Sequence, residues 1–207
     1  MNIVLEGIGR RFNRDWVFRH VDYRFETNHS YAVLGPNGSG KSTFLQVIAA
    51  NLMPSAGQVR YMVDHQPVET DSLYQYLSIA APYMELIEEF TLEEQLRFHF
   101  ALKNYLPEFD EERIIDLLGL RYAKDRQIRH FSSGMKQRVK LALACCSDVP
   151  LVLLDEPTSN LDHQGVDWYL NLVAQTQASR LLVVCSNQEK EYSFCDQQIN
   201  IVDYKSL

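Results

Sequence analysis

Short apolar runs near both ends of the chain predict a set of β-strands. Residues 31–34, 151–154 and 181–185 are almost continuously apolar, which is typical of central strands in a parallel sheet that is covered on both faces. Four further segments have strand character: residues 3–5, 58–62, 77–80 and 198–202. The two ends of the chain are therefore expected to build one strand-rich core.

The middle of the chain has a helical pattern. Between about residues 91 and 146, apolar side chains recur at helical spacing, as Leu92, Leu96 and Phe100 do. A further helix is predicted after the acidic residues 110–112, because negative charge stabilises a helix N-terminus. The pattern as a whole predicts an α/β protein in which a helical insertion interrupts the strand-rich core.

Composition narrows the function classes. The chain has 207 residues, of which 46% are apolar, enough to fill the core of one α/β domain. Its net charge of −7 and the lack of a Lys or Arg run argue against nucleic acid as a partner, because such binding usually begins with phosphate neutralisation. The four cysteines lack C-x-x-C spacing and are interpreted as reduced, buried thiols rather than a metal or redox site.

No membrane or export signal is visible in the sequence. The N-terminus has no basic region followed by a continuous apolar stretch, and the longest apolar runs are too short to cross a bilayer. If the protein serves a membrane process, another chain is expected to span the membrane.

Residues 35–42 match the phosphate-binding pattern G-x-x-x-x-G-K-[ST]. A predicted strand precedes them, and a helix beginning near Lys41 follows, with Phe44, Leu45, Ile48 and Leu52 on its apolar face. The glycines let backbone N–H groups turn inward around an anion, and the helix N-terminus adds further donors. A chance Gly-rich turn would lack this strand–helix context. The candidate nucleotide-binding residues are Gly35, Pro36, Asn37, Gly38, Ser39, Gly40, Lys41, Ser42 and Thr43.

Within this loop we expect three side chains to have separate roles. Lys41 supplies a positive charge for the β- and γ-phosphates, the Ser42 hydroxyl is a ligand for Mg²⁺, and Thr43 supports the α-phosphate. The pattern by itself is compatible with either Mg·ATP or Mg·GTP.

Two acidic residues follow the apolar run 151–154. Strand ends are where parallel sheets present functional groups, so Asp155 is predicted to hold Mg²⁺ and Glu156 to polarise an attacking water. The alternative is an exposed acidic turn. The phosphate-binding pattern in the same chain favours the ATPase interpretation.

Residues 131–138, with the sequence Phe-Ser-Ser-Gly-Met-Lys-Gln-Arg, resemble the signature motif of ABC-type ATP-binding domains, usually written L-S-G-G-Q. Ser132 and Gly134 match this motif, whereas Ser133 and Met135 replace its first Gly and its Gln. The segment also has the pattern of a capped helix N-terminus that exposes N–H donors to a γ-phosphate. On these motifs the whole chain is similar to ATP-binding subunits of ABC transporters.

The resemblance extends to two more positions. Residues 159–162 are similar to the family's D-loop, which implies that Asp162 takes part in coupling the two sites of a dimer. Phe12 lies where the family places an aromatic side chain that stacks on adenine. The resemblance thus adds Ser132, Ser133, Gly134, Met135, Asp162 and Phe12 to the candidate nucleotide-binding residues.

The family also implies a fold and an assembly. The fold would be a P-loop NTPase (RecA-like) core with an antiparallel β subdomain, formed by residues 1–82 and 148–207, and a helical subdomain, residues 83–147, that carries the signature. ATP and Mg²⁺ would bind between the P-loop of one subunit and the signature of a second, identical or homologous subunit. Hydrolysis would drive a membrane-spanning permease, which would hold the subunit at the cytoplasmic face of the membrane.

Two positions depart from the family pattern. Asn187 stands where the family has its switch histidine, and Pro82 stands at the Gln of its Q-loop, with Glu85 as a possible substitute. Asn donates a hydrogen bond but carries no charge or proton at neutral pH. With Glu156 and Lys41, Asn187 completes the predicted catalytic set, and we expect slow hydrolysis unless a partner completes the site.

Two alternative functions remain open at this stage. One is an ABC ATPase that acts on ribosomes or DNA, although the tandem domains, long coiled coils and basic extensions of such proteins are not visible here. The other is a regulatory module whose ATP-driven dimerisation is the output and whose hydrolysis is vestigial.

Overall fold

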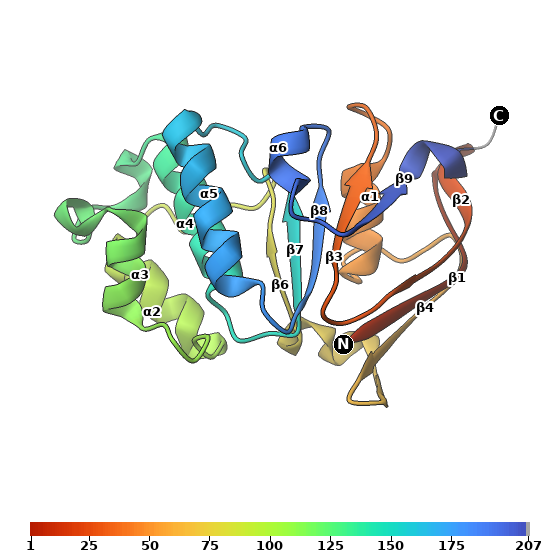
Figure 1. Cartoon of the computed structure of the whole chain (residues 1–207), viewed down its shortest axis with the longest axis horizontal. Coiled ribbons are helices and arrows are strands. Elements are labelled where there is room, and N and C mark those ends of the chain that lie inside the picture. The colour runs from red at the N-terminus through yellow and green to blue at the C-terminus, as the bar shows by residue number, and fades with distance from the viewer. Residues whose placement is uncertain (206–207) are drawn as a thin grey trace.

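The computed structural model describes residues 1–205 and shows a five-stranded parallel sheet at the centre of the molecule (Figure 1). The strand order is β6-β7-β8-β3-β9, and every neighbouring pair is parallel. All residues of β7 and β8 are buried, because both faces of the sheet are covered. The strands are β3 (Ser30–Leu34), β6 (Leu77–Ala80), β7 (Leu151–Asp155), β8 (Leu181–Cys185) and β9 (Gln197–Asn200).

A second, antiparallel sheet lies on the right in Figure 1, with the order β2-β1-β4-β5. Its first strand is much longer than the prediction for residues 3–5, and β2 and β5 were missed. The hydrophobic alternation of β2 is broken at His20, which has a positive φ of 56°, and β1 and β2 pair with register shifts. These strands are β1 (Asn2–Phe12), β2 (Asp15–Phe25), β4 (Ala56–Val63) and β5 (Gln66–Val68).

Helix α1 (Lys41–Ile48) packs in the core that joins the two sheets. Phe44 is fully buried and meets Phe18 of β2 edge to face, with 5.4 Å between ring centroids. The helix starts where predicted but ends before Leu52, which is partly buried beyond it. The prediction for residues 198–202 was wrong at its end, because Ile201–Tyr204 form a 3₁₀ turn.

Four longer helices lie on the other side of the parallel sheet, on the left in Figure 1. Residues of α4 and α5 pack with Val152 and Val184 of the sheet in one hydrophobic cluster. The helical pattern from about residue 91 to residue 146 is confirmed by α2 to α4, whereas the division into subdomains remains a prediction. The helices are α2 (Leu92–Leu102), α3 (Glu111–Leu118), α4 (Ser133–Cys145) and α5 (His163–Thr176), and a short α6 (Glu189–Tyr192) follows β8.

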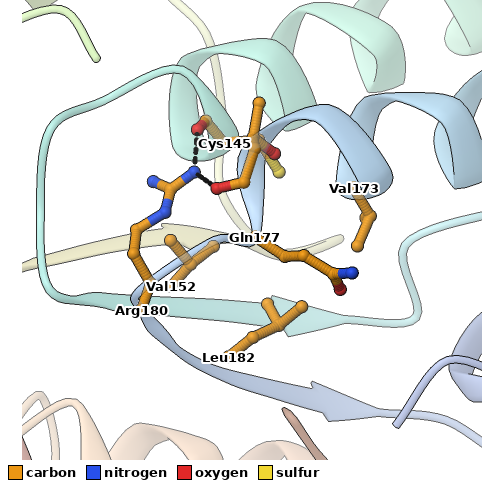
Figure 2. Close-up of a pocket in the computed structure, with 7 residues that line it drawn as sticks. Cys145, Val152, Val173, Gln177, Arg180 and Leu182 are labelled. Atoms are coloured by element: carbon orange, nitrogen blue, oxygen red, sulfur yellow. Dashed lines mark hydrogen bonds between the residues drawn. The ribbon is translucent and has the colours of Figure 1, made fainter. Parts of the chain in front are cut away.

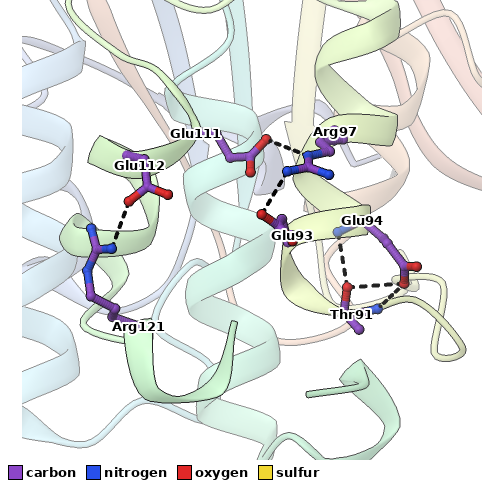
Figure 3. Close-up of polar contacts among 7 residues, drawn as sticks. All are labelled: Thr91, Glu93, Glu94, Arg97, Glu111, Glu112 and Arg121. Carbon is purple, nitrogen blue, oxygen red and sulfur yellow. Dashed lines mark hydrogen bonds and ion pairs between the residues drawn. The ribbon is translucent and has the colours of Figure 1, made fainter. Parts of the chain in front are cut away.

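Polar contacts define how α2 and α3 begin and meet (Figure 3). Thr91 and Glu94 form a capping box at the start of α2. Arg97 pairs with Glu93 at 2.7 Å and with Glu111 at 3.1 Å, so one guanidinium joins the two helices. On the exposed surface such pairs contribute little to stability.

The C-terminal ends of α4 and α5 are joined by Arg180 (Figure 2). This side chain is 6% exposed and donates to the carbonyls of Cys145 at 2.7 Å, Ser147 at 2.8 Å and Thr176. A cationic donor suits this place because helix C-termini present unpaired carbonyls. Cys145 itself is a free thiol, and burial raises its pKa to about 11.

No helix among residues 1–205 is long and apolar enough to cross a membrane.

Candidate nucleotide-binding site

The P-loop joins β3 to α1, and its glycines are required by close approaches. Gly40 has a φ of 106°, and a Cβ there would lie 2.4 Å from the Val17 side chain. A Cβ on Gly35 would lie 2.5 Å from the Ser39 hydroxyl oxygen. Only glycine fits both positions, so the loop forms a tight cradle at the N-terminus of α1.

The Lys41 side chain fills part of this cradle. It is 4% exposed, and its Nζ donates to the Gly35 carbonyl at 2.8 Å and to the Pro36 carbonyl at 3.3 Å. The depression around it has a volume of about 280 Å³ and is lined by Val17, Asn37, Gly38, Gly40, Lys41, Ser42, Thr43 and Glu156. The ammonium group and the free N–H groups of the α1 N-terminus make this depression suited to an anionic ligand.

Asp155 ends β7 beside the P-loop and is 1% exposed. Its Oδ1 has no hydrogen-bond partner within residues 1–205. Burial raises the pKa of Asp155, while a hydrogen bond from Ser42 and the charge of Lys41 oppose that rise. A buried carboxylate oxygen without a partner, next to a hydroxyl, fits the oxygen ligands that Mg²⁺ prefers.

This pair is too small to enclose a cation by itself. Across residues 1–205, no three His, Cys, Asp or Glu side chains gather into a metal site. Mg²⁺ usually keeps several waters and binds through one or two protein oxygens plus phosphate oxygens of the substrate. The donor set at Ser42 and Asp155 fits that pattern.

Glu156 follows Asp155 with an unusual backbone conformation. Its φ is 45°, a region that costs a non-glycine residue about 1–3 kcal/mol, and its amide donates to the Cys185 carbonyl at 2.9 Å. The turn brings Glu156 to the wall of the depression that holds Lys41. Such strain is tolerated where the surrounding structure fixes it, and it is frequent at functional sites.

Asn187 follows β8 and also reaches the P-loop. It is exposed, and its Nδ2 donates to the Oδ1 of Asn37 at 2.9 Å. The polar residue at the predicted switch position is therefore held beside the phosphate cradle by a side-chain contact.

The segment after β6 places neither of the predicted Q-loop residues, Pro82 and Glu85, in the P-loop depression. Pro82 and Glu85 are exposed, and Glu85 does not line the depression around Lys41. Burial lowers the pKa of Lys140, and the nearby Glu85 charge opposes this shift. Tyr83, which follows Pro82, is 45% exposed and does not line the depression around Lys41. Partial burial raises its pKa to about 12, and the nearby charge of Asp155 adds to this rise.

The signature residues lie in a second depression, of about 380 Å³, that shares no residue with the first. Ser132 caps α4 by accepting from the Met135 amide at 3.2 Å. A Cβ on Gly134 would lie 3.0 Å from the Asn160 carbonyl oxygen, which explains the small residue there. The lining includes Ser132, Ser133, Gly134, Met135 and residues 160–162.

Asp162 has a structural contact that the resemblance did not predict. It caps α5, accepting from the Gly165 amide at 2.7 Å. Because it also lines the second depression, the D-loop and the signature helix present one continuous surface, away from the P-loop of the same chain.

Phe12 lies at the end of β1 and is 49% exposed. The Arg10 guanidinium lies over its ring, 4.7 Å from the centroid. Phe12 itself does not line the P-loop depression, whereas Val17 of the adjoining β2 does. Stacking of a base on Phe12 therefore remains a prediction.

A phosphate-binding loop between a buried parallel strand and a helix, with an Asp-Glu pair at the end of a nearby strand, defines a P-loop nucleotide-binding domain. The family model described as "ABC transporter" matches residues 18–159, which include the P-loop, the signature segment and the Asp-Glu pair. The chain belongs to the ABC transporter family.

Relatives at low identity agree with this assignment. The chain is 28% identical over 206 residues to the daunorubicin/doxorubicin resistance ATP-binding protein DrrA of Streptomyces peucetius, covering 98% of this chain and 62% of that protein. It is 26% identical to the arabinose import ATP-binding protein AraG of Pectobacterium atrosepticum, covering 89% of this chain and 38% of that protein. It is 28% identical to the lipoprotein-releasing system ATP-binding protein LolD 1 of Rhodopseudomonas palustris, covering 97% and 96%. The chain thus spans less than two thirds of the first two relatives.

Solved structures share the fold. A structure described as the ATP binding subunit of an ABC transporter has a TM-score of 0.84 at 22% identity and covers 97% of this chain and 85% of its own. A dimeric ATP-binding cassette in a post-hydrolysis state, bound to ADP and Pi, has a TM-score of 0.80 at 19% identity, covering 96% and 93%. The predicted fold, a P-loop NTPase core with an additional antiparallel sheet, is confirmed.

Proposed function

We propose that this chain is the ATP-binding and hydrolysing subunit of an ABC transporter, and that it works as a dimer on a separate membrane-spanning partner. The observation that carries the proposal is the separation of the two depressions. The P-loop depression holds Lys41 and Glu156, whereas the signature residues line the other depression and do not reach the P-loop of their own chain. A complete site therefore needs a second chain.

The residues in and around one P-loop have separate roles in binding and hydrolysis. Lys41 leaves its contacts with the Gly35 and Pro36 carbonyls and pairs with the β- and γ-phosphates, while backbone N–H groups of the cradle hold their oxygens. Ser42 and Asp155 would hold Mg²⁺, which would neutralise negative charge on the phosphates. Glu156 orients and polarises the water that attacks the γ-phosphate. The Asn187 amide donates a hydrogen bond to the γ-phosphate.

The second subunit contributes the N-terminus of its α4. The first amides of this helix have no partner within the helix and carry the positive end of its dipole. Ser132 satisfies the Met135 amide, and Ser133 and Gly134 at the start of this helix line the second depression. These first amides are suited to the γ-phosphate of an ATP that is bound to the other chain.

A membrane-spanning partner is part of the proposal because the relatives are named for import, lipoprotein release and drug resistance. A depression of about 780 Å³ lies between β6 and α2 and offers a surface for that partner. Tyr74 is 66% exposed there and Leu102 is 74% exposed, so both side chains are available for apolar contact with such a partner. Such a partner would hold the subunit at the cytoplasmic face of the membrane.

Asn187 and Pro82 favour one second candidate. In a regulatory module with vestigial hydrolysis, ATP would still drive dimerisation, but the neutral Asn187 and the absent Gln at position 82 would leave turnover negligible. The two candidates differ in what loss of Glu156 does.

The deciding experiment is Glu156→Gln. Turnover of ATP is expected to fall by at least about 100-fold, because the base is lost, while Mg·ATP binding persists and an ATP-bound dimer accumulates in size-exclusion chromatography. Glu69→Gln, at an exposed position away from the P-loop, is the matched control. A wild-type protein that neither binds nor hydrolyses ATP would refute the proposal, and unchanged turnover in Glu156→Gln would favour the regulatory module.

A further inference from the structure

Glu191 is a buried carboxylate to which the proposed reaction gives no role. It lies in the short helix α6 and is 1% exposed. The Thr158 amide donates to its Oε1 at 3.0 Å, and the Thr158 hydroxyl donates to the same oxygen. The Ser186 hydroxyl donates to its Oε2. A buried carboxylate is tolerated only when such donors replace water.

The two residues that donate to Glu191, Thr158 and Ser186, lie close in sequence to residues of the proposed site. Thr158 belongs to the β7–α5 loop (residues 156–162), two positions after Glu156. Ser186 belongs to the β8–α6 loop (residues 186–188), directly before Asn187. One side chain thus joins the two loops that carry Glu156 and Asn187, although they are far apart in sequence.

The backbone of Glu191 is held by a contact with helix α5. The hydroxyl of Tyr169, a fully buried residue of α5, donates to the Glu191 carbonyl at 2.9 Å. Within residues 1–205 no Lys, Arg or His pairs with the Glu191 carboxylate. Its charge is therefore held by hydroxyls and an amide, and those groups all belong to the two loops.

Each of the two loops also contacts a further element of the site, α4 in one case and the P-loop in the other. The Gln137 side chain of α4 is 3% exposed and donates to the Pro157 carbonyl at 2.8 Å, so the signature helix holds the β7–α5 loop one residue before Thr158. At the other end, Asn187 donates to Asn37 of the P-loop. Glu191 stands in the middle of a series of side-chain hydrogen bonds from the signature helix to the phosphate cradle.

We propose that Glu191 is a positioning residue that holds the β7–α5 loop and the β8–α6 loop as one unit, so that contact of residues 160–162 with a second subunit moves Asn187 and Glu156 together. The proposal rests on the proposed function for its effect on catalysis. The link between the loops does not depend on that function, because it is formed within one chain.

The test compares Glu191→Gln with Glu189→Gln, an exposed residue of the same helix. The glutamine keeps the size of the side chain, but its NH₂ group cannot accept from the Ser186 hydroxyl, and the group loses the charge that strengthens the bonds from Thr158. We expect Glu191→Gln to lower kcat about tenfold with KM for ATP within twofold of the wild type. Hydrogen exchange is expected to rise in both loops.

Thr158→Val in the same background separates positioning from general destabilisation. If the two residues act through one contact, the double variant loses no more activity than Glu191→Gln alone, because their effects are not additive. A purely structural role predicts instead a lower melting temperature, faster exchange limited to α6, and a kcat like that of Glu189→Gln; that result overturns the proposal. If the wild type shows no ATP turnover, the proposed function fails, and hydrogen exchange alone decides: faster exchange in both loops supports the link, and exchange confined to α6 refutes it.

Discussion

The Asn187 side-chain amide donates to the side-chain oxygen of Asn37, with 2.9 Å between the two atoms. This contact joins the loop after β8 to Asn37 of the P-loop, which lines the depression that holds Lys41. It places a neutral donor where a titratable imidazole would be expected from the family pattern. The proposed hydrolysis therefore has a positioned hydrogen-bond donor at position 187, but this donor cannot gain or release a proton near neutral pH.

Asn187→His is expected to raise the ATP turnover of the isolated protein. An imidazole at this position donates a hydrogen bond and can also transfer a proton near neutral pH, which the amide cannot. General acid–base groups raise reaction rates by about 100-fold or more when they are well placed. We expect a gain of about tenfold in steady-state phosphate release. Gln188→His, at the next exposed position, is the control; an equal effect in both variants would contradict the assignment of position 187.

Phe12→Ala is expected to weaken ATP binding. Loss of stacking costs about 1–3 kcal/mol per base, which corresponds to a Kd that rises about 5- to 150-fold. The same factor is expected for GTP, because every base has a stacking face. Fluorescence titration with a labelled nucleotide measures it. Phe98→Ala is the matched control, since Phe98 is 47% exposed on α2 and Phe12 is 49% exposed; equal losses would place the base elsewhere.

Arg180→Met is expected to destabilise the fold without changing nucleotide affinity. The substitution removes the side-chain donor from the helix-end carbonyls of Cys145 and Thr176, and it leaves the Ser147 carbonyl with the Val149 amide alone. We expect a loss of about 3 kcal/mol in the free energy of unfolding and a decrease of about 6–12 °C in Tm, measured by circular dichroism. Arg19→Met, at an exposed position, controls for the loss of charge. A Tm within 2 °C of the wild type would show that water replaces the guanidinium.

His99 is expected to make stability depend on pH in the acidic range. Burial lowers its pKa to about 4, and the Lys103 charge adds to the shift, while Nε2 contacts the Ser147 hydroxyl at 2.9 Å. The unfolded chain takes up a proton as the pH falls below about 6.5, whereas the folded chain does so only near pH 4. The native state therefore loses stability between these values, by about 2 kcal/mol at pH 5.

His99→Gln removes this titration while keeping a side chain that can bond to Ser147. Denaturant unfolding at pH 7.5 and pH 5 should show that the variant loses about 2 kcal/mol less than the wild type between the two conditions. Equal losses in both proteins would mean that His99 is protonated with an ordinary pKa in the folded state.

Most of the parallel sheet and the P-loop could be predicted from sequence, because their signals are local. Continuous apolar runs gave β7 and β8, and the Gly-x-x-x-x-Gly-Lys pattern gave the turn into α1 at Lys41. Strand β2 was missed because its positive-φ residue His20 and the shifts in its pairing with β1 interrupt the alternation. Helix α1 ends before Leu52 because Ala50 has a positive φ of 56°, a helix-ending conformation that alanine does not signal in the sequence.

The sequence by itself determined the chemistry of this protein: a phosphate cradle, a carboxylate pair at a strand end, and Asn187 in place of a histidine. Only the tertiary structure decided which of these groups share a space. It brought Glu156 and Asn187 to the P-loop, kept Gly134 away from it, and linked Thr158 to Ser186 through Glu191. The physical reason is that motif residues are fixed by local backbone geometry, whereas contacts between distant loops depend on how the sheet and the helices pack.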